Sequence, residues 1–254
     1  MTEAALLAEL PAWAFAFMLV LARCGMAVAL LPGLGEAEPP AMVRAGLALA
    51  LVALVLPGLG PVADPGSAWR AASMVGAELF CGGVLGWLAR LLALALPIAG
   101  QVVSFMLGLS NVVQLDVALG QASALSRLFS LAAPVLVLAT GLWMLPVAAL
   151  DGSYALVPPG AWLPMADSAQ AVVAAVGASF ALALQLAAPF VFASVLWQVA
   201  LGLTGRLIPH LQVYFAAIPG QIVGGLALLG LLSAGMLDAW SEAVRAGLAR
   251  LPGL

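Results

Sequence analysis

Charged residues are scarce in this sequence. Only 7% of its 254 residues are Asp, Glu, Lys or Arg, against about 25% in an average soluble domain. All eight basic residues are arginines, and a net charge of −3 offers no basic surface for nucleic acid. Hydrophobic residues make up 65% of the chain, and the mean hydropathy is +1.18. The composition excludes a soluble globular protein and predicts one polytopic membrane domain, residues 1–254.

Residue types that carry catalysis or bind metals are also few. His210 is the only histidine, and Cys24 and Cys81 lie apart in apolar segments, where buried free thiols are the simplest interpretation. A zinc site needs about four clustered ligands, and the sequence holds neither a nucleophile motif nor a phosphate-binding loop. We therefore expect a protein that is not an enzyme, without metal or cofactor.

Long apolar stretches dominate the chain instead. They cover residues 12–31, 45–56, 71–99, 128–150, 168–205 and 222–237. Most approach the roughly 20 residues of a membrane span, although the second and last are short and the third and fifth are long. The pattern predicts an all-α membrane protein with about six apolar segments that form helical hairpins.

The segment 168–205 is unusual because its 38 residues include no charged residue and no histidine. One straight helix of that length would extend about 57 Å, whereas the hydrocarbon core of a bilayer is about 30 Å thick. Pro189 lies near the middle, where its missing N–H and its ring favour a break. The sequence predicts either a hairpin of two membrane segments or a long kinked helix that leaves the hydrocarbon.

Two stretches are more polar than the rest. Residues 100–127 are rich in Gly, Gln and Ser, and we expect them to form a polar loop with backbone freedom at Gly108 and Gly120. Residues 238–254 carry two arginines and are predicted to form a short amphipathic C-terminal tail.

Three charged residues interrupt the apolar segments: Arg23, Glu78 and Arg90. Charges in a membrane are costly and need partners or water. Glu78 and Arg90 cannot pair on one helix, because 12 positions separate them by about 18 Å and about 120°. A pair between Arg23 and Glu78 on two helices is possible. A structural ion pair or interface contact is the first interpretation, and a proton or ion path is the alternative.

Two glycine pairs have the spacing of a close-packing helix motif. They are Gly82 with Gly86 and Gly220 with Gly224. With 27 glycines in the chain, about three such pairs are expected by chance, so the motif carries no functional weight here.

The stretch 202–225, GLTGRLIPHLQVYFAAIPGQIVGG, resembles the signature near the C-terminus of the FliR family, membrane components of the flagellar type III export gate. The signature positions are Arg206, Pro209, Phe215 and Pro219. Further upstream, the resemblance extends to Leu31-Pro32-Gly33, Pro40, Arg44, Glu78, Gly82, Gly86, Arg90, Gly100 and Gly108. The chain departs from the family pattern at Asp116-Val117, where Asp-Pro is common, and at Gln221, where Lys is common.

The resemblance implies a fold like a fusion of FliP-like and FliQ-like subunits. It implies a hetero-oligomeric gate with FliP and FliQ, contacts with FlhB and FlhA, and passage of unfolded export substrates across the bacterial inner membrane at the flagellar basal body. It also maps a pore plug to about 106–124, with the residues Met106, Gly108, Asn111, Gln114, Asp116, Gly120 and Gln121. The alternatives are an injectisome export-gate subunit, a small proton-coupled secondary transporter using Glu78 and Arg90, and a purely structural assembly factor.

Overall fold

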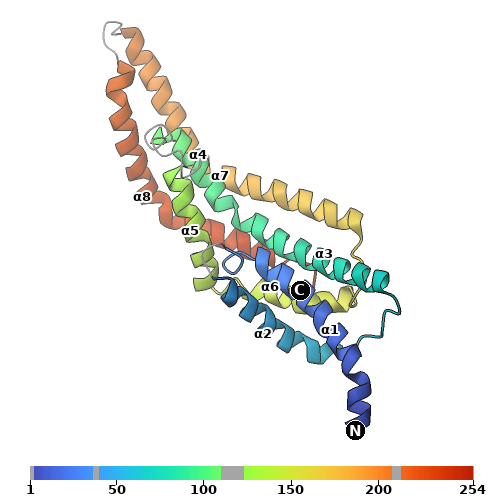
Figure 1. Cartoon of the computed structure of the whole chain (residues 1–254). Coiled ribbons are helices and arrows are strands. Elements are labelled where there is room, and N and C mark those ends of the chain that lie inside the picture. Colours follow the sequence, from blue (N-terminus) through green and yellow to red (C-terminus); the bar gives the residue numbers. More distant parts are fainter. Residues whose placement is uncertain (1–2, 37–39, 110–122, 208–212, 254) are drawn as a thin grey trace. The chain divides into compact units, whose positions relative to one another are not determined.

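The computed structural model describes residues 3–36, 40–109, 123–207 and 213–253. Within these ranges the chain forms eight helices and no strand, which confirms the predicted all-α class (Figure 1). The helices are α1 (Glu3–Leu30), α2 (Ala41–Leu59), α3 (Ala68–Ala93), α4 (Ala95–Met106), α5 (Ala124–Ala139), α6 (Met144–Leu156), α7 (Met165–Leu207) and α8 (Val213–Leu248). In the described part of the chain, five helical spans are long and apolar enough to cross a membrane, and the bent pair α5 and α6 is a sixth candidate.

The helices are grouped into two compact units built from interleaved pieces of chain. Residues 1–92, 137–176 and 245–254 make the first unit, and residues 93–136 and 177–244 make the second. Because neither unit is one continuous stretch of sequence, no single cut in the chain separates them.

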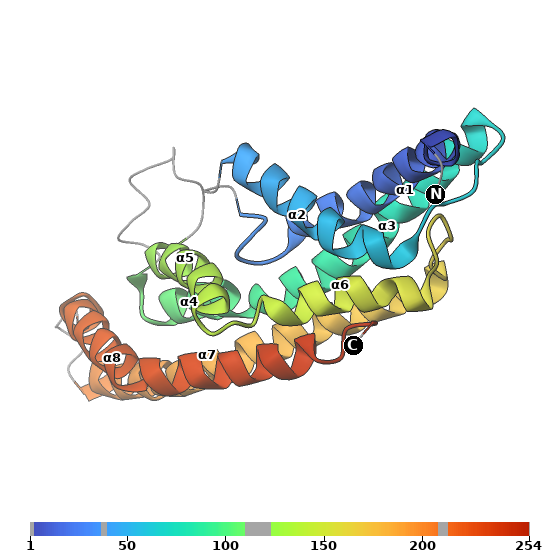
Figure 2. The ribbon, with the colours of Figure 1, turned by 90° about the horizontal axis from the view of Figure 1, so that it is seen from below.

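The first unit is centred on α1, α2, α3 and α6, which both ribbon views draw next to one another (Figures 1 and 2). Its core consists mainly of aliphatic and small side chains, which recur three or four positions apart on α1 and α2, as burial of one helix face requires. The core residues are Val20, Cys24, Ala27, Val28, Ala48, Leu51, Val52, Val55, Leu85, Leu150 and Tyr154.

Two of the predicted segments are each divided into two helices. The segment 71–99 breaks at Leu94, between α3 and α4. Pro97 stands in the first turn of α4, and its ring would clash with the carbonyl of Ala93 if α3 continued without a break. The segment 128–150 breaks between α5 and α6, where Gly141 adopts a φ of 73° that favours glycine.

The hairpin predicted within 168–205 is wrong. The whole stretch lies inside α7, a helix of 43 residues that passes through Pro189 without interruption. Proline is tolerated there because it removes a single backbone hydrogen bond, to the carbonyl of Gln185, and neighbouring helices can compensate for that loss. The stretch therefore forms one long helix. A hairpin is instead formed by the parts of α7 and α8 in the second unit, which run antiparallel (Figure 1).

The predicted polar loop and C-terminal tail are both partly helical. Residues 100–106 belong to α4 and 124–127 to α5, so the connection between these helices covers 107–123. Residues 238–248 continue α8.

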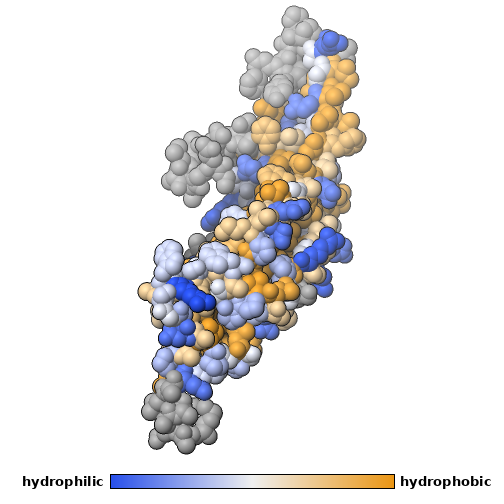
Figure 3. Space-filling model, turned by 90° about the vertical axis from the view of Figure 1, so that its right-hand side faces the viewer, coloured by the Kyte–Doolittle hydropathy of each residue, from blue (hydrophilic) through white to orange (hydrophobic). Residues whose placement is uncertain are grey.

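Large apolar side chains are exposed on many helices. Leu54, Val173 and Leu231 are 68%, 72% and 79% exposed, and apolar surface covers much of the face in Figure 3. A soluble monomer rarely exposes such areas, which mark contact with lipid or with other proteins.

Candidate functional site

The most enclosed polar cluster of the described residues is built around Arg23, in the C-terminal third of α1. Its side chain and that of Glu78 on α3 are both fully buried. The guanidinium donates from Nε to Glu78 Oε2 at 2.7 Å and from Nη2 to Glu78 Oε1 at 3.0 Å. This is the two-bond geometry that makes an arginine–carboxylate pair strong. The ion pair between Arg23 and Glu78, which the sequence analysis gave as possible, is therefore present.

The end of α6 and the loop after it complete this cluster. Arg23 also donates to Ser153 Oγ at 3.0 Å and to the carbonyl of Val157 at 3.1 Å. The backbone N–H of Gly160 donates to Glu78 Oε1 at 2.7 Å. The guanidinium carbon lies 3.8 Å from the centre of the Tyr154 ring, within cation–π range.

These contacts favour the structural interpretation over an ion path. Both carboxylate oxygens of Glu78 accept bonds from inside the protein, and four donated bonds engage Arg23. A proton relay needs a group that can exchange partners. Arg90 pairs with Glu36 at 3.1 Å instead of Glu78, as expected from its distance along α3, and that pair is partly exposed.

The glycine pair Gly82 and Gly86 explains how α1 and α3 come close enough for this bond. A Cβ on Gly82 would overlap the carbonyl oxygen of Arg23, and a Cβ on Gly86 would lie 2.8 Å from the Cβ of Leu30. The first glycine pair therefore allows close packing of α1 on α3. In the second pair, a Cβ on Gly220 would make an ordinary contact of 3.5 Å with Trp197, and a Cβ on Gly224 would meet nothing within 4 Å.

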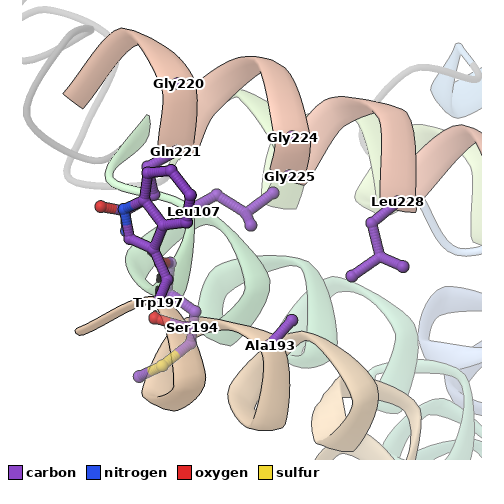
Figure 4. A pocket seen from close by; sticks show the side chains of 10 residues that line it. Leu107, Ala193, Ser194, Trp197, Gly220, Gln221, Gly224, Gly225 and Leu228 are labelled. Carbon is purple, nitrogen blue, oxygen red and sulfur yellow. Dashed lines mark hydrogen bonds between the residues drawn. The ribbon is translucent and has the colours of Figure 1, made fainter. Parts of the chain in front are cut away.

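A second cluster lies in the other unit, at the last residue of α4. The carbonyl of Met106 accepts bonds from Ser194 Oγ on α7 at 3.0 Å and from Gln221 Nε2 on α8 at 2.8 Å (Figure 4). The last carbonyls of a helix have no hydrogen-bond partner within the helix, so Ser194 and Gln221 supply the donors that the carbonyl of Met106 lacks. Beside them is a cavity of about 110 Å³, lined mainly by apolar groups.

The other end of the connection 107–123 is also held. The backbone N–H of Ser123 donates to Gln101 Oε1 at 3.0 Å, and Ser126 Oγ donates to the carbonyl of Pro97 at 3.0 Å. Gly100 lets α5 lie against α4, because a Cβ there would come within 2.6 Å of the Phe129 ring. We name Met106, Ser194, Gln221, Gln101 and Ser123 the loop anchor.

The structure describes part of the predicted plug and signature. Met106 ends α4, and Gly108 follows it with a φ of 74°. Arg206 lies in the last turn of α7, and Phe215 and Pro219 lie in α8. Asn111, Gln114, Asp116, Gly120, Gln121 and Pro209 lie outside the described residues. The anchor residues Ser194 and Gln221 are not among the sequence-predicted site residues. Ser194 is a polar residue inside the apolar segment 168–205, a signal that could point to it, and Gln221 immediately precedes the last apolar segment.

Comparison with known proteins gives a consistent result. Residues 14–247 match the family of bacterial export proteins, family 1. The chain is 34% identical to the flagellar biosynthetic protein FliR of Caulobacter vibrioides, over 89% of this chain and 92% of that protein. It is 25% identical to the FliR of Escherichia coli, over 79% and 77%, and 27% identical to that of Aquifex aeolicus, over 60% and 59%. The chain therefore belongs to the FliR family of bacterial export proteins and is a membrane-embedded component of the flagellar export apparatus.

Proposed function

We propose that this chain forms part of the wall and the seal of a channel through which unfolded flagellar proteins cross the bacterial inner membrane. The partners are FliP-like and FliQ-like subunits in one hetero-oligomeric gate, together with FlhB-like and FlhA-like proteins of the flagellar basal body. The extensive exposed apolar surface supports this assembly, because neighbouring subunits and lipid would cover it.

The loop anchor is the observation that carries the proposed seal. It holds both ends of the connection 107–123, Met106 from α7 and α8, and Ser123 from Gln101 of α4. A segment fixed at both ends can be pushed aside by a passing chain and then return to its place. Apart from Met106, which ends α4, the plug residues that the family resemblance indicates belong to this connection.

Removing the seal is expected to make the membrane leak. Deletion of residues 111–120 should raise passive ion flux in cells that assemble the gate, measured as dissipation of the membrane potential. The double variant Ser194→Ala and Gln221→Met removes both donors to Met106, so it should leak less than the deletion but more than the parent protein. Ser233→Ala on α8 is the matched control, because this hydroxyl bonds only to a carbonyl of its own helix. A tight membrane after the deletion, with the gate assembled, would refute the seal.

Partner capture tests the assembly separately. We expect a tagged full-length chain, extracted from native membranes in mild detergent, to bring down FliP-like and FliQ-like proteins in one stable complex. Recovery of the chain alone, or only with copies of itself, would contradict the gate and favour the small transporter. If the chain is recovered with injectisome subunits, the proposed gate function would belong to an injectisome and not to a flagellum.

A further inference from the structure

An apolar groove runs between α1 and α2 in the first unit. Its volume is about 440 Å³, which is within the range of about 300–1,000 Å³ that ligand pockets occupy. Leu21, Gly25 and Ala29 line it from α1, and Ala45 and Leu49 from α2. Ala29, Ala45 and Leu49 are exposed, so the groove opens on the outside of this helix pair.

Arg44 is the one charged residue among those lining the groove. Its Nε is buried and has no hydrogen-bond partner among the described residues. The two salt bridges that the described part of the chain forms join Arg23 to Glu78 and Arg90 to Glu36, so neither neutralises Arg44. A buried guanidinium N–H without an acceptor is costly, so an acceptor from outside the chain would stabilise this site, and the positive charge of Arg44 favours an anionic one.

The positions along the helices give the groove a polar and an apolar end. Arg44 lies in the first turn of α2, close to the connection from α1, and Ala29 lies opposite near the end of α1. Leu21 and Leu49 lie at the other end. The eight positions from Ala29 to Leu21 correspond to about 12 Å along the helix axis. In a membrane helix, an arginine one turn from the end reaches the headgroup region while its neighbours remain in hydrocarbon.

We propose that this groove binds a phospholipid with an anionic headgroup. The Arg44 guanidinium holds the phosphate with charge-assisted bonds, and one acyl chain lies along the groove between α1 and α2. Arginine suits this role because its planar donors match two phosphate oxygens. The apolar lining selects a lipid over free phosphate, because phosphate would gain nothing from a groove of Leu, Gly and Ala side chains. The bound lipid would fill the outer face of the helix pair that carries Arg23.

Native mass spectrometry of the full-length chain, with whatever partners copurify, tests the proposal with added dioleoylphosphatidylglycerol. We expect retention of the lipid by the parent protein and about tenfold weaker binding by Arg44→Gln, as loss of a charge-assisted bond implies. Gly25→Leu should fill the groove, and the first atom of the new side chain has room, because a Cβ at this position meets nothing within 4 Å. Thermal unfolding of this variant in detergent shows whether the fold is kept. Arg70→Gln is the matched control, since Arg70 is an exposed arginine in the first turn of α3, outside the groove.

Each outcome bears on the proposal. Loss of lipid in Arg44→Gln and in Gly25→Leu, with normal binding in Arg70→Gln, supports it, and resistance to competition by inorganic phosphate supports a lipid over a simple anion site. Equal retention by all four proteins, or no retention by the parent protein, overturns it. If the parent protein holds no lipid, and a variant with a photoreactive amino acid in place of Ala45 crosslinks to another subunit, a protein helix occupies the groove instead.

Discussion

Arg23→Met is expected to destabilise this protein more than any other single substitution considered. It leaves the Glu78 carboxylate buried with only the N–H of Gly160 as a partner. Removing one member of a buried ion pair costs about 3–5 kcal/mol, because the remaining charge is no longer compensated. The measurements are the amount of chain in the membrane and its thermal unfolding in detergent. An unfolding temperature equal to that of the parent protein would contradict the buried pair.

The double variant Arg23→Met and Glu78→Met separates a structural clamp from an ion path. Replacing both charges by apolar residues of similar length often restores stability. We therefore expect the double variant to be more stable than Arg23→Met alone and to keep flagellar assembly. A double variant that is stable and correctly inserted, but no longer exports, would show that the pair has a role in export beyond stability.

Glu78→Gln tests the same question with a smaller chemical change than the double variant. The amide oxygen of glutamine can still accept a bond from Gly160 or Arg23, although the charge is lost. Proton-coupled export that continues unchanged in Glu78→Gln would exclude a relay through this residue.

Gly82→Ala is expected to have the second-largest effect. Its new Cβ would overlap the carbonyl oxygen of Arg23, and backbone atoms cannot move aside as a flexible side chain can. Overpacking of this kind costs about 1–3 kcal/mol. It should also separate α1 from α3 and lengthen the bonds between Arg23 and Glu78. The expected result is a lower unfolding temperature and lower protein levels.

Two glycines provide matched controls for this substitution. On the same helix, a Cβ at Gly83 would make an ordinary contact of 3.7 Å with the flexible Met26 side chain. On α8, a Cβ at Gly224 would meet nothing within 4 Å. Both alanine variants should match or slightly exceed the parent stability, because alanine favours a helix by up to about 1 kcal/mol over glycine. If Gly82→Ala behaved as they do, the close approach of α1 and α3 would be refuted.

The sequence alone determined the class of the protein and the positions of most helices. Apolar runs with so few charges can be stable only in a membrane, and this follows from local composition without any tertiary contact. The same local reasoning identified Arg23 and Glu78 as charges that require partners. The ordered set of residues around Arg206 and Pro219 indicated the family, which the comparisons confirm.

Tertiary packing determined the features of the structure that the local sequence pattern could not predict. Pro189 has the same chemistry whether a helix breaks or continues, so only the structure showed that α7 continues and forms the hairpin with α8. Gly82 and Gly224 belong to glycine pairs of the same spacing, but a Cβ would overlap the backbone of the opposite helix at Gly82 and meet nothing within 4 Å at Gly224. The bonds from Ser194 and Gln221 to Met106 join residues 88 and 115 positions apart. Contacts between residues so far apart in the sequence depend on how the helices pack in space, and the local sequence pattern does not predict that packing.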